Sequence, residues 1–340
     1  MTLVLGIQHT RVYYYSSGET SINPSMHSHK FVIFAALALA SALPAHASLT
    51  FNPTFTGAFI ADFGTNALAA EAAFNAATAI FSNAFTDPIT INITVTAVTG
   101  TGTLGQSNTP ISSIGWSTLE ADLAADAKSA ADFAATGVGG SITGADPSTD
   151  TWWLTRAQEK ALGIIASDGV NDGTITVGTG YAYTYDDSGG VAAGTIDLTA
   201  VFAHEISEVM GRIGLSGASI NGGPALTLLD AYSFTGAGAR GLGGGAGNFF
   251  SIDDGTTLLK AFNNATANGG DTRDWASGTN DSFNAFSSFG VLNPVSPVDL
   301  EEMDVLGYDS AVPEPATVAM VGLALLAGGF LGRRRLQKSA

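Results

Sequence analysis

The sequence contains no cysteine and few basic residues. Without cysteine, disulfide bonds, thiol nucleophiles and Cys-type zinc sites are excluded, so any metal must be bound by histidine, carboxylate, carbonyl or water. Only 13 Lys and Arg stand against 30 Asp and Glu, which gives a formal net charge of −17 over 340 residues. This charge argues against nucleic-acid partners and against anionic membrane surfaces.

Charged residues of either sign are also scarce, at 13% of the chain, whereas glycine is abundant with 42 residues. This composition predicts many turns and a lightly charged surface. A hydrophobic fraction of 45% is enough for one or two ordinary cores. The composition therefore argues against wholesale disorder.

Apolar runs beside positive charge at both ends of the chain predict processing segments. A short basic segment from Met26 precedes the apolar residues 31–43 and the A-x-A cleavage pattern at residues 45–47. Residues 26–47 are therefore predicted to be a secretory signal peptide that signal peptidase removes. Residues 1–25 lack periodicity and place the signal at an unusual depth, so we interpret them as a misassigned extension and Met26 as the true start.

The C-terminal segment, residues 312–340, has three parts. Pro313-Glu314-Pro315 is followed by an apolar stretch to residue 332 and then by Arg333, Arg334 and Arg335. This arrangement closely resembles the PEP-CTERM sorting signal of Gram-negative, exopolysaccharide-producing bacteria. The resemblance implies transient anchoring through the C-terminal transmembrane helix, cleavage by an exosortase, and delivery to the cell surface or the extracellular matrix. The alternative is a plain membrane anchor, for which a span of about 25 Å is short against a core of about 30 Å.

The remaining core, residues 48–311, carries 7 Lys and Arg against 28 Asp and Glu, a formal net charge of −21. This negative charge favours solubility of the exported domain and attracts Ca²⁺. No repeat is visible, and we expect one α+β domain whose C-terminal half is rich in loops. The expected helices are residues 67–82, 116–133, 155–166, 198–210 and 298–306, and the expected strands are residues 89–98, 174–185 and 249–252.

His204 is the only histidine of this core, and it lies in the run FAHEISEVMGR at residues 202–212. Residues four apart share a helix face, so the His204 imidazole and the Glu208 carboxylate can meet one cation. Glu205 projects about 100° away, where it can reach a metal-bound water. This is the layout of the H-E-x-x-H zinc helix, except that Glu208 stands where the second histidine is expected. Gly211 lies on the same face and would leave room for the chain to return beneath the metal.

A purely structural interpretation of this helix remains open. In that alternative, Glu208 and Arg212 form an ordinary i,i+4 ion pair, Glu205 is solvated, and His204 is packed in the core. The helix is otherwise apolar, and burial of two carboxylates beside an imidazole is costly unless a cation or donors neutralise them. A metal site is therefore favoured.

The sequence around residues 202–212 resembles that of a family of zincin-like metalloproteases that carry PEP-CTERM signals. The resemblance covers most of residues 50–310 and rests on the HE helix followed by the runs LLDAYS (228–233), FSIDDG (250–255), GDTRDW (270–275) and VDLEEMDVLGY (298–308). It implies a metzincin-like domain with a mixed sheet, the HE helix as the floor of the site, and a returning C-terminal segment.

Three further residues are candidates for this site. Asp230 follows Glu208 after a glycine-rich turn and is the predicted third metal ligand, with an aspartate in a surface loop as the alternative. Tyr232 is a possible oxyanion donor, with a packed aromatic ring as the favoured alternative. Met303 has the spacing of a core residue, with a position beneath the metal as the alternative.

Loops rich in glycine and asparagine carry a second set of carboxylates. Such loops often bind Ca²⁺, although their spacing matches no EF-hand, and solvated side chains are an equal alternative. The possible calcium ligands are Asp253, Asp254, Asp271, Asp274 and Asp281.

The leading hypothesis is a secreted endopeptidase that hydrolyses protein or peptide substrates. Zn²⁺ on His204, Glu208 and a downstream carboxylate would acidify a bound water, and Glu205 would act as the general base. The alternative is a non-enzymatic surface or exopolysaccharide-matrix protein on a degenerate zincin fold, with a structural or Ca²⁺ site. Carbohydrate binding through the acidic loops and Trp275 is a weaker alternative.

Overall fold

The computed structural model describes residues 48–136 and 151–311. The predicted signal peptide, N-terminal extension and sorting signal lie outside these described residues. Within them the chain forms helices and several sheets, so the expected α+β class and mixed sheet are confirmed. No helix of the described part is both long and apolar enough to cross a membrane.

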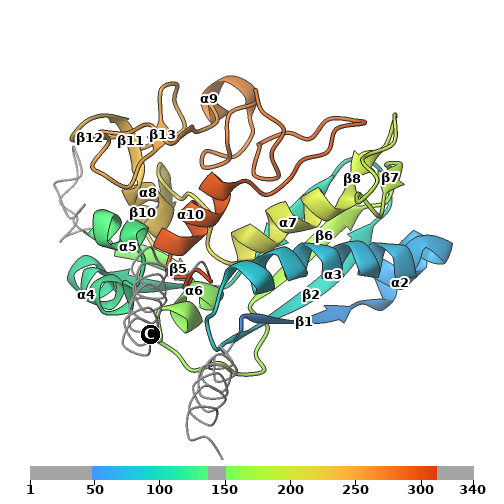
Figure 1. The fold of residues 1–340 in the computed structure, drawn as a ribbon, viewed down its shortest axis with the longest axis horizontal. Helices are drawn as coiled ribbons and strands as arrows, with labels where there is room; N and C mark the ends of the chain where they lie inside the picture. Colours follow the sequence, from blue (N-terminus) through green and yellow to red (C-terminus); the bar gives the residue numbers. More distant parts are fainter. Residues whose placement is uncertain (1–47, 137–150, 312–340) are drawn as a thin grey trace, which may run out of the picture. The chain divides into compact units, whose positions relative to one another are not determined.

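The first sheet has the strand order β1-β2-β6-β3 (Figure 1). Its strands are β1 (Thr50–Phe55), β2 (Thr90–Val98), β6 (Gly173–Gly178) and β3 (Gly105–Asn108). The first three strands are parallel, and β3 joins β6 in the antiparallel direction as an edge strand. Alternating β-branched residues give β2 its strand character, and Ile91, Ile93 and Val95 are buried.

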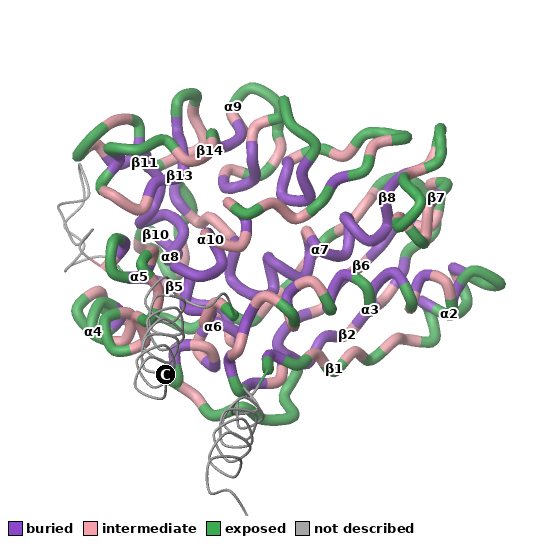
Figure 2. Tube along the Cα trace, in the orientation of Figure 1, coloured by how far each residue is buried: buried purple, intermediate pink, exposed green. Residues whose placement is uncertain are grey.

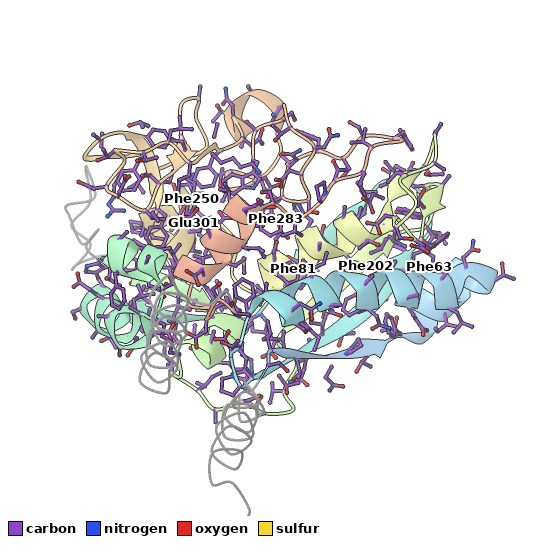
Figure 3. The ribbon with its side chains drawn as sticks, in the orientation of Figure 1. Phe63, Phe81, Phe202, Phe250, Phe283 and Glu301 are labelled. Carbon is purple, nitrogen blue, oxygen red and sulfur yellow. The ribbon has the colours of Figure 1, made fainter. Side chains whose placement is uncertain are left out.

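Helices α2 (Gly57–Phe63), α3 (Ala67–Ala84) and α7 (Leu198–Val209) pack against this sheet, with the 3₁₀ turn η1 (Gly64–Asn66) between α2 and α3. Alanines on the buried face of α3 allow α7 to approach closely, and the two helices lie side by side (Figure 1). The rings of Phe74 and Phe202 meet edge to face at 5.3 Å. Phe81 and Phe202, labelled in Figure 3, belong to the same buried core.

Two further sheets complete the fold. The second has the order β4-β5-β10-β9 and the third the order β12-β11-β13-β14, while β7 and β8 form a short parallel pair. The second sheet contains β4 (Ile111–Gly115), β5 (Thr151–Thr155), β10 (Gly223–Thr227) and β9 (Ala218–Ile220). The third contains β12 (Ala239–Arg240), β11 (Ser233–Gly236), β13 (Phe249–Phe250) and β14 (Lys260–Ala261), and the pair is β7 (Tyr183–Thr184) and β8 (Ile196–Asp197). The remaining helices are α4 (Trp116–Asp126), α5 (Ala130–Ala135), α6 (Arg156–Ala161), α8 (Leu228–Ala231), α9 (Ala265–Asn268) and α10 (Pro297–Val305).

The strongest sequence patterns are confirmed. Helices α3, α7 and α10 and strand β2 occupy the expected positions, and β13 is shorter than expected. The prediction of one helix over 116–133 is wrong, because the chain forms two helices here, α4 and α5, with a break between them. The N-cap of α4 is Gly115, which has no side-chain cap, whereas Ser129 and Asp132 form the capping box that begins α5. The helix expected at 155–166 ends early, and the strand expected at 174–185 is divided between β6 and β7.

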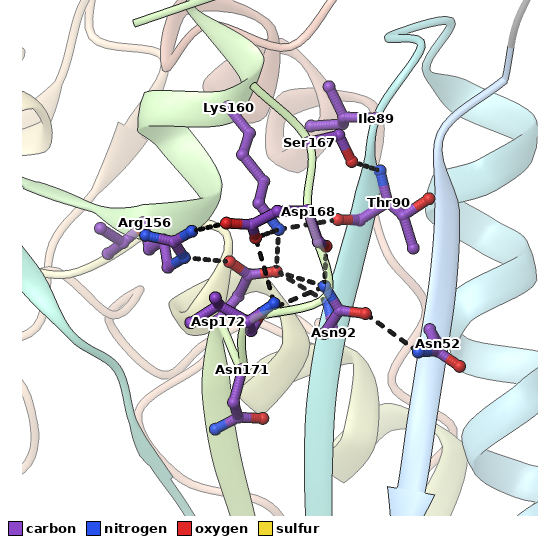
Figure 4. A network of polar contacts seen from close by, with 12 residues as sticks. Asn52, Ile89, Thr90, Asn92, Arg156, Lys160, Ser167, Asp168, Asn171 and Asp172 are labelled. Atoms are coloured by element: carbon purple, nitrogen blue, oxygen red, sulfur yellow. Dashed lines mark hydrogen bonds and ion pairs between the residues drawn. The ribbon is translucent and has the colours of Figure 1, made fainter. Parts of the chain in front are cut away.

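A buried ion-pair network fixes α6 to the parallel sheet (Figure 4). Lys160 of α6 is buried and donates to a carboxylate oxygen of Asp172 at 2.6 Å and to the carbonyl of Thr90 at 3.0 Å. Asp172 also accepts from the backbone amide of Asn92 on β2 at 2.8 Å. Asn52 of β1 extends the network to the outer strand by donating to the Asn92 side chain at 2.9 Å. The network therefore joins α6 to β1 and β2.

We predict that Lys160→Met lowers the free energy of unfolding by about 3–5 kcal/mol, because Asp172 would stay buried without its lysine. Urea denaturation measures this loss. Lys128→Met is the control, since the Lys128 side chain is 62% exposed, whereas that of its partner Asp309 is 12% exposed. Because water largely solvates the Lys128 charge, its attraction to Asp309 is screened, and we expect a loss of about 1 kcal/mol. Equal losses in the two variants would contradict the prediction.

Candidate functional site

Helix α7 positions the candidate site, and both of its ends are fixed. Asp197 caps the N-terminus, accepting from the amide of Ala200 at 3.1 Å and from the amide of Asn293 at 3.2 Å. After Met210, Gly211 ends the helix with a φ of +115°, a conformation that favours glycine. Figure 2 shows α7 buried along most of its length. Side chains on this helix therefore have little freedom to move away from the site.

The interpretation of Gly211 as space for a returning chain is wrong. A β-carbon at this position would lie 2.1 Å from the side chain of Gln158 on α6. The glycine is required by its positive φ and by this contact with Gln158.

Three potential ligand groups converge beside α7. The His204 Nε2 lies 3.4 Å from Oε1 of Glu208 and 3.6 Å from Oδ1 of Asp274. The ligand atoms of these three residues all lie within 4.8 Å of one another. Asp274 comes from the loop after α9, so the cluster joins the helix to the C-terminal half of the chain.

The orientation of the His204 ring suits a metal ligand. Its Nδ1 lies 2.9 Å from the carbonyl oxygen of Ser282, which accepts the ring N–H. This contact leaves Nε2 facing the two carboxylates, the arrangement in which a second hydrogen bond fixes the tautomer of a ligating histidine. Burial opposes the charged ring, but Asp274 and then Glu208 outweigh it and raise the pKa of His204 to about 10.

Glu208 is held in its ionised form. Burial alone would raise its pKa, but the hydrogen bond and charge of His204, with Arg212 and Ser107, lower that pKa to about 2. The Ser107 hydroxyl on strand β3 donates to Oε2 of Glu208 at 2.7 Å. The edge strand therefore holds the same carboxylate that faces His204.

Glu205 is buried against the edge strand rather than solvated. Its residue is 6% exposed, and Oε2 has no hydrogen-bond partner among the described residues. Burial, followed by the charge of Glu208, raises the pKa of Glu205 well above its usual value. A β-carbon on Gly105 would lie 2.3 Å from Oε1 of Glu205, so this glycine provides the space for the carboxyl group.

Arg212 supplies an internal positive charge. Its Nη1 donates to Oδ1 of Asp274 at 2.6 Å, and its Nη2 lies 3.7 Å from Oε1 of Glu208. The Ser207 hydroxyl accepts from Nε at 2.7 Å, and the guanidinium stacks 4.5 Å from the centroid of the Phe283 ring. The Glu208–Arg212 ion pair expected in the purely structural interpretation is therefore present. Arg212 also pairs with Asp274, a contact that this interpretation did not include.

An open groove runs past these residues along β3. A cavity of about 680 Å³ lies on the side of Leu104 and includes His204, Glu205 and Glu208 in its wall. A second cavity of about 470 Å³ continues past Ser107 to Ile111. Both include Glu208, Asp271 and Asp274, so the cluster lies where the two cavities meet.

Asp230, the predicted third ligand, does not join the cluster. Its Oδ1 accepts from Nε of Arg273 at 2.9 Å, and its Oδ2 accepts from the amides of Leu215 and Thr227 at 3.0 and 2.9 Å. These contacts place Asp230 in the capping box of α8, whose N-cap is Thr227, and make it the partner of a buried arginine. The third potential ligand group, beside His204 and Glu208, is the carboxylate of Asp274.

Tyr232, Met303 and Trp275 are buried away from the groove. Tyr232 packs edge to face on Phe250 with ring centroids 6.3 Å apart, and burial raises its pKa. Met303 belongs to the main core. Trp275 is fully buried and stacks on Phe262, so its ring presents no exposed face to a carbohydrate. None of the three lines either cavity of the groove.

The predicted calcium ligands are separated by the fold. Asp253 accepts from the Thr257 amide at 2.8 Å within a tight turn, followed by Asp254 with a positive φ of 56°. Asp281 pairs with Lys260. Asp271 alone accompanies Asp274 in the groove, where burial and the charge of Asp274 raise the pKa of Asp271. Within the described ranges, His204, Glu208 and Asp274 are the one group of three potential ligand residues whose ligand atoms lie within 4.8 Å of one another.

Sequence reasoning missed Gly105, Ser107 and the role of Asp274. Asp274 belongs to the GDTRDW run, and the sequence predicts it as a calcium ligand because loop carboxylates carry no signal of their partners. Gly105 and Ser107 lie in a short polar strand without an apolar alternation. Their position became visible only through the pairing of β3 with β6.

Comparison with known families identifies one segment. Residues 311–335 match the PEP-CTERM protein-sorting motif. The PEP-CTERM motif implies an exported protein of the Gram-negative cell envelope that is processed by an exosortase. No curated protein and no solved structure matches the chain.

We predict that Asp274→Asn lowers the free energy of unfolding by about 3 kcal/mol in the presence of chelator, because Arg212 would stay buried without its closest carboxylate. Asp271→Asn is the matched control. It lines the same groove and repels Asp274, so its removal leaves stability equal or slightly higher. Guanidinium denaturation with EDTA measures both variants, and equal losses would contradict the assigned ion pair.

Proposed function

We propose that this protein is an exported, zinc-dependent endopeptidase with a zincin-like, metzincin-like domain. The convergence of His204, Glu208 and Asp274 beside the buried Glu205 carries the proposal. One imidazole and two carboxylates are a ligand chemistry that suits Zn²⁺, with the Nδ1 contact of His204 supporting the ring.

The local charges are compatible with a divalent cation. With a neutral His204, the carboxylates of Glu208 and Asp274 outweigh the single charge of Arg212 by one negative charge. A divalent cation would change this balance to one positive charge, which an ionised Glu205 would neutralise. Glu205 is therefore expected to become a carboxylate when the metal is present, although burial opposes its ionisation otherwise.

Glu205 is the proposed general base and acid. A zinc ion would supply Lewis-acid chemistry that polarises the scissile carbonyl and makes a water more acidic. The Glu205 carboxylate would accept the proton of the attacking water and then donate it to the leaving amine. Gly105 keeps the space in which this carboxyl group lies. His204, Glu208 and Asp274 would hold the metal.

The proposed substrate is an extended segment of polypeptide. Strand β3 is the edge of its sheet, and the groove follows it from Leu104 to Ile111. An edge strand offers unpaired backbone groups to which a peptide can add as a further strand. A peptide bound in this way would pass directly over the cluster, because Gly105 contacts Glu205 and Ser107 contacts Glu208.

A non-enzymatic role is the second candidate, and Arg212 favours it. With a protonated His204, the charges of His204 and Arg212 balance those of Glu208 and Asp274 without any metal. The cluster would then be a structural network in a protein of the cell surface or of the exopolysaccharide matrix. In both candidates, the exosortase releases the domain from its transient C-terminal anchor, after which it reaches the surface or matrix.

We predict that Glu205→Gln abolishes hydrolysis and retains zinc, because the amide can neither accept nor return the proton. Cleavage of an unfolded protein substrate in the presence of zinc measures activity, and elemental analysis measures the metal. Glu71→Gln, a half-buried glutamate on α3, is the matched control and should leave both unchanged. Undiminished cleavage by Glu205→Gln would remove this mechanism.

A further inference from the structure

Glu302 on α10 is a buried carboxyl group that the proposed chemistry does not use. The residue is fully buried, and neither of its side-chain oxygens has a hydrogen-bond partner in the described part of the chain. Buried polar groups are nearly always hydrogen-bonded, so an unpartnered carboxyl group requires an explanation.

The charged groups that act on Glu302 come from α10 itself and from three other segments. Arg212 stabilises its ionised form most strongly, followed by Lys260, whereas Asp299 and Asp274 oppose ionisation. Burial exceeds these effects and raises the pKa of Glu302 well above its usual value. The influence is reciprocal, because Glu302 helps to raise the pKa of Arg212. Nη2 of Arg212 has no hydrogen-bond partner either.

In the structure described, Arg212 binds the carboxylate of Asp274, which the proposed zinc would need as a ligand. Its Nη1 donates to Oδ1 of Asp274, and this same oxygen is the one that lies nearest to Nε2 of His204. A divalent cation at the cluster would attract Asp274 and repel the guanidinium. A second carboxylate partner would allow Arg212 to move away without being left as an unpaired buried charge.

We propose that Glu302 is a positioning residue that receives the guanidinium of Arg212 when a divalent cation binds to His204, Glu208 and Asp274. The inference rests on the proposed metal centre. When Glu302 accepts Arg212, its carboxyl group releases its proton to solvent, and the resulting carboxylate pairs with the guanidinium. Asp274 is then free to ligate the cation. Metal binding is thereby coupled to a proton that leaves from α10.

Glu302→Gln tests this exchange, because the amide has the shape of the neutral carboxyl group and cannot ionise. Zinc is titrated into the purified protein by calorimetry in two buffers with different ionisation enthalpies, which gives both the affinity and the protons released. Relative to the unmodified protein, Glu302→Gln should bind zinc about 10- to 100-fold more weakly. It should also release about one proton fewer per zinc, with an unchanged melting temperature in chelator.

Glu301→Gln, the neighbouring half-buried residue of the same helix, is the matched control and should behave like the unmodified protein. Equal affinity and equal proton release in Glu302→Gln would overturn the exchange while leaving the metal centre intact. A failure of the unmodified protein to bind zinc would instead overturn the proposed function and, with it, this inference. A merely structural role for Glu302 would lower the melting temperature in chelator and leave the proton count unchanged.

Discussion

The site depends on the balance of charge around two buried carboxylates. Helix α7 and the loop after α9 bring Glu208 and Asp274 to the same side of His204, with little water to screen them. Carboxylates in such a place are stable only beside positive charge or hydrogen-bond donors. Arg212, the His204 ring and the Ser107 hydroxyl supply these in the structure described. Each chemical role proposed for the cluster is a different way to satisfy this requirement.

The architecture explains why the requirement arises at this position. The buried alanine face of α3 holds α7 against the parallel sheet, and the edge strand β3 then lies along the side of α7 that carries Glu205 and Glu208. Gly105 leaves space for one carboxyl group, and Ser107 donates to the other. A groove remains open on this side, so the only histidine of residues 48–311 lies at an accessible position beside an unpaired strand edge.

Sequence reasoning located the helix and its polar face because these features are local. Apolar periodicity and the cap at Asp197 define α7, and the four-residue spacing places His204 beside Glu208. The third ligand group, the carboxylate of Asp274, depends on contacts between distant segments. Asp230 and Asp274 are both loop aspartates in the sequence, and only the fold pairs Asp230 with Arg273 and brings Asp274 to the histidine. The charged groups that act on Glu302 could not be predicted for the same reason, since Arg212, Lys260 and Asp274 lie far from α10 along the chain.

The central claim is that a metal ion satisfies the charge of this cluster in the functional protein. Its most direct test is the metal content of the purified protein, prepared without chelator, beside that of His204→Ala. The account predicts about one zinc per chain, lost in the variant, as expected for a single mononuclear site. Absence of a transition metal from the unmodified protein, or a zinc content that His204→Ala leaves unchanged, would contradict it.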